Sequence, residues 1–168
     1  MSRNLESYIF IIVFAVSVGP AALCRNGWKS HGDSCYLFTA TYSDWGSAAS
    51  ICMELRSHLL EIDSPDEDLF ILTTLRAQTT NHASEGFWIG MSEIEVNREF
   101  RWTYSDRLVV SGYHNWYPGQ PEAGAQHCGI LWKHQNLTYG WDDHYCNHQN
   151  AYFICEKEST NDNEEIVG

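Results

Sequence analysis

Two short clusters of side chains carry oxygen ligands in this chain of 168 residues. Gln120-Pro121-Glu122 precedes Cys128, and Trp141-Asp142-Asp143 follows it. Amide and carboxylate oxygens are the ligands that a hard cation prefers, and Ca²⁺ takes 6–8 of them. The two clusters therefore predict a calcium site, provided that the fold brings them together.

The histidines near the second cluster offer another interpretation. His144 and His148, together with His127 and Asp142, could be drawn as a zinc site. Cys146 lies between the first two, and the backbone there reads as a loop rather than as a helix that would align them. We therefore interpret them as surface or buffering histidines, because the geometry that zinc requires is not indicated.

Glu122, Asp142 and Asp143 also suggest glycoside hydrolysis, which uses a pair of carboxyl groups. No positioned acid stands out among the three, and binding alone accounts for the same residues. We therefore expect a binding protein and not an enzyme.

The first part of the chain differs in kind from the rest. Arg3 begins a short polar stretch, residues 9–18 form an uncharged apolar run, and residues 19–22 are small. This order is typical of a signal peptide over residues 1–22, and the apolar run is shorter than the roughly 20 residues that span a bilayer. A retained N-terminal anchor is the alternative. We expect a secreted protein.

The net charge limits the possible partners of the protein, and the cysteines indicate disulfide bridges. The net charge of −12 argues against nucleic acid and anionic membranes as partners, because both recruit Lys and Arg. An even number of cysteines in an exported chain predicts three disulfide bridges. Six cysteines allow 15 pairings, and their positions alone do not choose among them. The six are Cys24, Cys35, Cys52, Cys128, Cys146 and Cys155.

Two helices are predicted in the first half of the domain. From Asp44 to Leu55, apolar residues recur at three- and four-residue spacing. Ser64 before Pro65 marks the start of the second helix, which extends to about residue 77. The apolar side of the second helix is predicted from Leu69, Phe70, Leu72 and Leu75.

After residue 80, short aromatic and β-branched runs between turn residues predict strands. The stretch from Tyr104 to Gln126 is long enough to be a functional loop. Residues 158–168 are acidic and polar, and we expect them to form a flexible tail.

In their order along the chain, these landmarks resemble the C-type lectin-like domain. Trp88-Ile89-Gly90-Met91 is similar to the family's W-I-G-L strand, Trp141-Asp142-Asp143 stands where it usually has W-N-D, and Phe153-Ile154-Cys155-Glu156 is similar to its closing strand. The resemblance implies an α+β fold over residues 24–157, with two helices, two small antiparallel sheets and a long ligand-binding loop. It also implies a cis bond before Pro121 and the bridges Cys24–Cys35, Cys52–Cys155 and Cys128–Cys146. We interpret the large aromatic residues as core residues, because aromatic side chains dominate cores; they are Trp88, Trp102, Trp141 and Phe153.

The resemblance also implies a ligand set. The family's principal calcium site takes oxygens from five positions, which fall here on Gln120, Glu122, Gln126, Asp142 and Asp143. In these lectins two sugar hydroxyls bind the metal, and each donates a hydrogen bond to an acid and accepts one from an amide. The acid–amide pairs here are Gln120 with Glu122 and Gln126 with Asp142. Both are inverted relative to the mannose type, whereas the galactose type inverts only the first, so the sugar class stays open. A solvated acidic loop that merely resembles the site is the alternative.

Residues outside the five predicted ligands are considered for a second calcium site, for glycosylation and for stacking on a sugar. The family's auxiliary calcium site is not expected, because Glu93 and Asn97 match two of its ligands but Ala123 and His127 stand where carboxylates belong. Asn136 opens a glycosylation sequon. The candidates to stack on the apolar face of a sugar are Trp116, Tyr117, Trp132, Tyr139 and His144.

The resemblance implies a secreted, calcium-dependent lectin that recognises glycans on cell or microbial surfaces in innate immunity. Weak binding at a single shallow site favours a homo-oligomer. The alternative is a calcium-independent module that binds protein, extracellular matrix or mineral. We expect neither a nucleic-acid partner nor insertion into a membrane.

Overall fold

The computed structural model describes residues 24–78, 86–93, 99–122, 124–134 and 138–160. The predicted signal peptide, most of the predicted tail, Asn97, Ala123 and the predicted glycosylation site Asn136 lie outside the described residues. Within those ranges, no helix is both long enough and apolar enough to cross a membrane.

Both predicted helices are present. Helix α1 spans Trp45–Glu54 and helix α2 spans Pro65–Gln78. Helix α2 begins at the predicted Pro65, and α1 begins one residue after the predicted Asp44, which is its N-cap. The side chains of Asp44 and Ser64 accept the backbone N–H three residues later, at 2.8 and 3.2 Å. These bonds satisfy donors that the first turn of a helix leaves without partners, so both helix starts are fixed by local sequence.

The buried face of α2 differs from the predicted one. Ile71 and Leu75 are buried, but Leu69 is 58% exposed, so its assignment to the apolar side is wrong. The acids Glu67 and Asp68 lie on the buried face instead. Buried polar groups need hydrogen-bond partners, and these two acids have them inside the domain.

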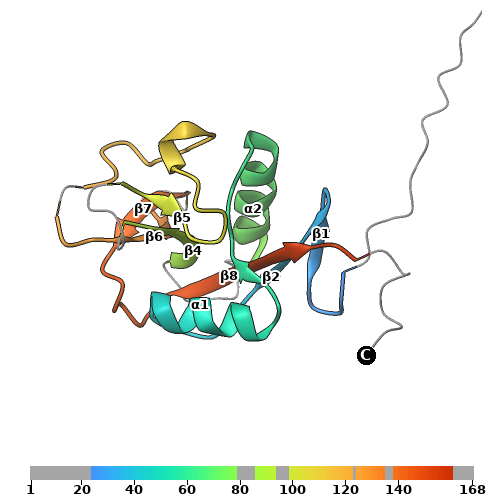
Figure 1. Cartoon of the computed structure of the whole chain (residues 1–168). Helices are drawn as coiled ribbons and strands as arrows, with labels where there is room; N and C mark the ends of the chain where they lie inside the picture. Colours follow the sequence, from blue (N-terminus) through green and yellow to red (C-terminus); the bar gives the residue numbers. More distant parts are fainter. Residues whose placement is uncertain (1–23, 79–85, 94–98, 123, 135–137, 161–168) are drawn as a thin grey trace, which may run out of the picture.

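The strands form one sheet centred on β8. They are β1 (Lys29–His31), β2 (Ser34–Phe38), β3 (His58–Leu59), β4 (Gly86–Ser92), β5 (Arg101–Trp102), β6 (Cys128–Lys133), β7 (Tyr139–His144) and β8 (Tyr152–Glu158). Their order is β1-β2-β8-β4-β6-β7, with β3 paired to β8 and β5 to β4. Because β8 runs antiparallel to β2 and parallel to β4, it joins the two antiparallel groups that were expected. In Figure 1 the group with β1 and β2 lies at the right and the group with β6 and β7 at the left.

The predicted core aromatics are confirmed. Trp88, Trp141 and Phe153 are fully buried, and Trp102 is nearly so. The rings of Trp102 and Trp141 meet edge to face, with centroids 5.5 Å apart. Because Trp141 is anchored in this way, the positions of the next two residues on β7 are fixed relative to the core.

The three disulfide bridges implied by the resemblance are present. They are Cys24–Cys35, Cys52–Cys155 and Cys128–Cys146. Cys52–Cys155 ties α1 to β8, and Cys128–Cys146 ties the start of β6 to the segment after β7. Such links stabilise a fold mainly by restricting the unfolded chain.

The first residue of the predicted tail belongs to a strand instead. Glu158 is the last residue of β8 and is paired with Ser34. The backbone N–H of Ser159 donates to the carbonyl of Asp33 at 2.8 Å. Placing Glu158 in the flexible tail is therefore wrong, because strand pairing with β2 continues through it.

Candidate functional site

The long segment after β5 carries the first predicted cluster to the edge of β7. It includes one short 3-10 helix, η1 (Val109–Ser111). The backbone N–H of Tyr117 donates to the carbonyl of Trp141 at 2.8 Å, and the Gln120–Pro121 bond is cis, as the resemblance implied. The segment therefore runs beside the strand that bears the second cluster.

One buried carboxylate, that of Asp68 on α2, holds this segment and β7 together. Its Oδ2 accepts from the Tyr113 hydroxyl at 2.9 Å and from Asn115 Nδ2 at 2.7 Å. Its Oδ1 accepts from Trp141 Nε1 at 3.0 Å. Burial and the bond to Asp68 raise the pKa of Tyr113 to about 12. Asp68 is thus a positioning residue that sequence patterns did not identify, because an acid in the first turn of a helix is usually exposed.

A direct hydrogen bond joins the two predicted clusters. The backbone N–H of Glu122 donates to Asp143 Oδ1 at 2.8 Å, and the backbone N–H of Asp143 donates to Asp142 Oδ1 at 2.8 Å. The Asp142 and Asp143 residues are 8% and 1% exposed, while Glu122 is exposed. The fold therefore brings residues 122, 142 and 143 into one area.

The negative charges in this area act on one another. Burial, followed by the charges of Asp143 and Glu122, raises the pKa of Asp142 to about 6. Burial and the charges of Glu122 and Glu93 also raise the pKa of Asp143. Desolvation and like charges both disfavour an ionised carboxylate, and a bound cation would oppose both effects.

Two of the predicted ligands have a buried oxygen atom with no hydrogen-bond partner among the described residues. These atoms are Gln120 Oε1 and Asp143 Oδ2, and the hydroxyl of the core residue Tyr139 is a third such oxygen. Buried polar atoms are rarely left unsatisfied, and amide and carboxylate oxygens are ligands of hard cations. The donor types of these residues therefore fit calcium.

The carboxylates alone do not form a metal site. Over the described ranges, no three His, Cys, Asp or Glu side chains gather into a group that could hold a metal ion. Gln126 is partly exposed and makes no hydrogen bond to the other four predicted ligands in the part of the chain that the structure describes. A calcium ion would therefore need amide oxygens in addition to the acids.

His134 lies next to the predicted site, although no motif marks it in the sequence. Its Nε2 is 3.4 Å from Asp142 Oδ2, without the alignment of a hydrogen bond. Its ring stacks on Tyr117, with centroids 3.4 Å apart. Burial lowers the pKa of His134, which favours the neutral imidazole. His134 and Tyr117 thus form a wall beside Asp142.

One of the five aromatic candidates for sugar stacking, Tyr139, is wrong. Tyr139 is 4% exposed and belongs to the core. Trp116 packs edge to face on Phe100 and Trp141. The Tyr139 ring is therefore not available to a sugar, whereas the partly buried Trp116 stays a candidate.

The remaining histidines near the site have partners of their own. His127 Nδ1 lies 2.8 Å from Glu93 Oε1, which connects one end of the long segment to β4. The rings of His144 and His148 are 4.4 Å apart, and His144 packs on Trp132. The candidate ring of Trp132 is therefore partly covered.

Comparisons with known proteins place this geometry in a family. A family model described as the lectin C-type domain matches residues 41–157. A perlucin-like protein from Mytilus galloprovincialis is 32% identical over 153 residues, which cover 90% of this chain and 94% of that protein.

Two solved structures are similar in fold. The C-type carbohydrate-recognition domain of cow CD23, determined in the presence of a GlcNAc2Man3 oligosaccharide, is 26% identical with a TM-score of 0.69, covering 83% of this chain and 99% of that one. The Ca²⁺-independent C-type lectin SPL-2 from Saxidomus purpuratus is 27% identical with a TM-score of 0.71, covering 82% and 96%. The match over residues 41–157 and the perlucin-like relative show that this chain belongs to the C-type lectin domain family, a family of carbohydrate-binding rather than catalytic domains.

Proposed function

We propose that this protein is a secreted, calcium-dependent lectin. Its ligands for one Ca²⁺ and for the sugar are Gln120, Glu122, Gln126, Asp142 and Asp143. The observation that carries the proposal is the arrangement of Asp143. Its Oδ1 accepts from the backbone of Glu122, and its buried Oδ2 has no partner among the described residues. A cation beside Oδ2 would satisfy that oxygen, while the other oxygen holds the loop in place.

The ligand set also has the donors that a sugar requires. A hydroxyl can bind the metal, donate to an acid and accept from an amide, which uses its full bonding capacity. The pairs Gln120 with Glu122 and Gln126 with Asp142 each keep one acid and one amide. Because both pairs are inverted, the two-fold arrangement of hydrogen-bond donors and acceptors in the mannose-type site is retained. Sugars with vicinal equatorial hydroxyls are therefore proposed ligands in addition to galactose.

The biological setting follows from the same features. Three disulfide bridges are typical of proteins in oxidising compartments, which supports secretion. The natural partners are glycans on cell or microbial surfaces, with a role in innate immunity. Assembly into a homo-oligomer would raise the weak affinity of one site through multivalency.

Calorimetry tests this proposal. Ca²⁺ is titrated into the mature protein, and mannose and galactose are then added in Ca²⁺ and in EDTA. We expect heat from calcium binding, and heat from at least one sugar that EDTA abolishes. Absence of calcium binding, or sugar binding that EDTA leaves unchanged, contradicts the proposal.

A second candidate function is supported by a specific observation. No metal-holding group of His, Cys, Asp or Glu exists in the described ranges, and a similar solved lectin is Ca²⁺-independent. The chain would then bind protein, extracellular matrix or mineral without calcium. Retention on such a partner in EDTA, together with no heat from calcium, favours this candidate.

A further inference from the structure

A pocket of about 1010 Å³ lies apart from the predicted calcium ligands, none of which lines it. Its walls come from Arg25 and the start of β2, from the residues after α1, from β3 and the segment after it, from the turn after β5, and from the end of β8 and the residues after it. Hydroxyl and charged side chains make up most of the lining, and the hydroxyls are those of Ser34, Ser57, Tyr104, Ser105 and Thr160. A pocket of this kind suits a ligand with many hydroxyl groups of its own.

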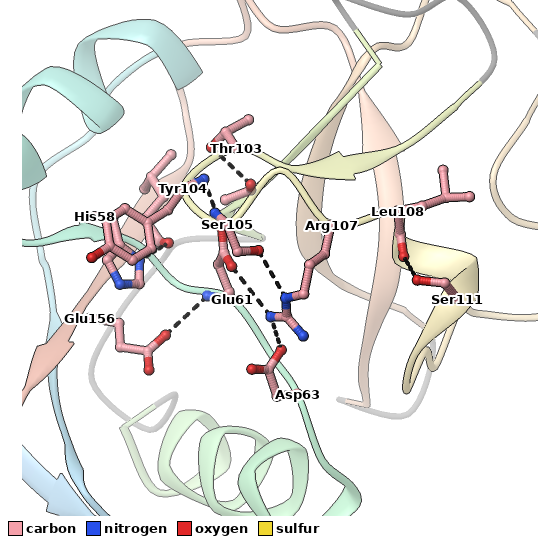
Figure 2. A network of polar contacts seen from close by, with 12 residues as sticks. His58, Glu61, Asp63, Thr103, Tyr104, Ser105, Arg107, Leu108, Ser111 and Glu156 are labelled. Carbon is pink, nitrogen blue, oxygen red and sulfur yellow. Dashed lines mark hydrogen bonds and ion pairs between the residues drawn. The ribbon is translucent and has the colours of Figure 1, made fainter.

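Tyr104 provides a flat aromatic surface in this pocket. One face of its ring stacks on His58, with centroids 3.9 Å apart and planes 11° apart, yet Tyr104 is 70% exposed. The other face is therefore open to solvent. In Figure 2 the two stacked rings overlap at the left of the polar network around Glu61.

The backbone that carries Tyr104 is firmly held. Glu61 is 5% exposed, and its Oε1 accepts the backbone N–H groups of Tyr104 and Ser105 at 2.8 and 3.1 Å (Figure 2). The backbone N–H and the hydroxyl of the preceding Thr103 both bond to the carbonyl of Gly90. A ring held in place before binding loses little freedom when a ligand arrives, which favours affinity.

Arg56 supplies a cationic group at the same pocket. It follows the end of α1, where its N–H bonds to Met53 and the next N–H bonds to Cys52, each at 3.0 Å. Its φ is +55°, in a position where helices usually place glycine. Arg56 and Asp106, in the turn after Tyr104, are the two non-glycine residues with positive φ in the described part of the chain. Such outliers are concentrated at functional sites.

The guanidinium of Arg56 is exposed and makes no hydrogen bond or ion pair with any described residue. Three of the four acids that line the pocket, in contrast, have hydrogen-bond or ion-pair partners, and the fourth, Glu158, is exposed at the end of β8. Glu156 accepts from Ser34 Oγ at 2.9 Å and from the Glu61 N–H at 3.1 Å, and Arg107 pairs with Glu61 and Asp63. Arg56 is therefore available to an anionic ligand.

We propose that this pocket binds an anionic saccharide independently of calcium. The C–H face of the sugar ring packs on the open face of Tyr104. A carboxylate or sulfate group of the sugar accepts paired hydrogen bonds from Arg56, whose planar guanidinium matches both groups. The site shares no residue with the proposed calcium site, so one chain can engage two different glycan features.

The test measures binding by calorimetry in EDTA at constant ionic strength, with three probes. Trigalacturonate carries carboxylates, a carrageenan tetrasaccharide carries sulfates, and cellotriose is neutral. We expect one or both anionic probes to bind at least about tenfold more tightly than cellotriose. The probe that binds identifies carboxylate or sulfate as the recognised group.

Matched variants assign the binding to the pocket. Arg56→Gln and Tyr104→Ala each weaken binding of the anionic probe by about tenfold or more, and Arg76→Gln, which removes an equal charge from α2, changes it by less than about twofold. Arg56→Gly should weaken binding of the anionic probe to the same extent. Glycine adopts the positive φ at this position without strain, so a loss of binding in this variant is not caused by misfolding. Failure of both anionic probes to bind, or equal effects of the Arg56 and Arg76 variants, overturns the proposal. Binding of mannose and galactose in Ca²⁺, measured on the same variants, should stay unchanged, so failure of this site is distinguishable from failure of the calcium site.

Discussion

The backbone N–H of Glu122 and the carboxylate of Asp143 are joined by a hydrogen bond of 2.8 Å, which closes the long segment onto β7. Asp143 therefore has two separable tasks. Its Oδ1 holds the loop, and its Oδ2, which has no hydrogen-bond partner among the described residues, would bind the proposed cation. An amide at this position retains an acceptor for the first task but lacks the negative charge for the second.

Asp143→Asn should therefore lower calcium affinity by about tenfold or more while leaving the fold intact in EDTA. Because burial raises the pKa of Asp143, loss of its charge should not destabilise the calcium-free protein. Calcium titration and thermal unfolding in EDTA measure the two effects. Glu99→Gln, at an exposed acid on another segment, is the control and should change neither. Equal calcium affinity in Asp143→Asn and the parent protein would remove Asp143 from the ligand set.

The order of acid and amide in the second pair is open to a direct test. The double variant Gln126→Glu with Asp142→Asn keeps the number of acids and the pairing, but restores the order that the family commonly has. The first pair alone is then inverted, as in the galactose type. We expect the preference for galactose over mannose to rise by about tenfold, measured by competition on a sugar resin. An unchanged ratio would mean that the order within the pairs does not select the sugar.

Local signals were sufficient for the helices. Asp44 and Ser64 carry the capping side chains in the sequence itself, so both helix starts could be predicted. The buried side of α2 could not be predicted, because a pattern of apolar residues assigns the acids Glu67 and Asp68 to the exposed side. Their partners come from distant segments, and only the folded chain brings Trp141 Nε1 to Asp68.

In the candidate site, too, local motifs were predictable from the sequence and contacts between distant segments were not. The predicted ligand positions 120, 122, 142 and 143 come from a motif, and the bond between Glu122 and Asp143 shows that the two clusters meet. His134 Nε2 lies 3.4 Å from Asp142 Oδ2, and no local pattern in the sequence predicts this contact. Tyr139 was a stacking candidate by residue type, but its side of β7 faces the core.

Asp68→Ala should destabilise the domain by about 3 kcal/mol, because Trp141 Nε1 and the Tyr113 hydroxyl lose their acceptor. Since Asp68 also holds the long segment, calcium affinity should fall as well, although Asp68 is not a proposed ligand. Urea unfolding and calcium titration measure both effects. Asp66→Ala is the matched control in the same helical turn, because the Asp66 side chain is 84% exposed and pairs only with His31 in the described ranges. If the two variants lose equal stability, Asp68 does not act as a positioning residue.

Glu156 should make the stability of the domain depend on pH. Burial, followed by the charge of Glu67, raises the pKa of Glu156 from 4.5 to about 7. The folded state thus holds the proton more tightly than the unfolded state does. Its contribution is complete below the unfolded pKa and is lost as the pH rises through about 7, a change on the order of 3 kcal/mol. Urea unfolding should therefore show greater stability at about pH 5 than at about pH 8.

Glu156→Gln isolates this contribution from those of the other buried acids. The amide oxygen can accept from the Glu61 N–H and the amide nitrogen can donate to Ser34 Oγ, so the variant imitates the protonated acid. We expect it to be more stable than the parent above about pH 7 and to have a flatter pH profile. Glu158→Gln lies two residues further along β8 on an exposed position and should leave the profile unchanged. An identical profile for the parent and Glu156→Gln would show that Glu156 is ionised in the folded state at neutral pH, with its cost met by Ser34 and the Glu61 N–H alone.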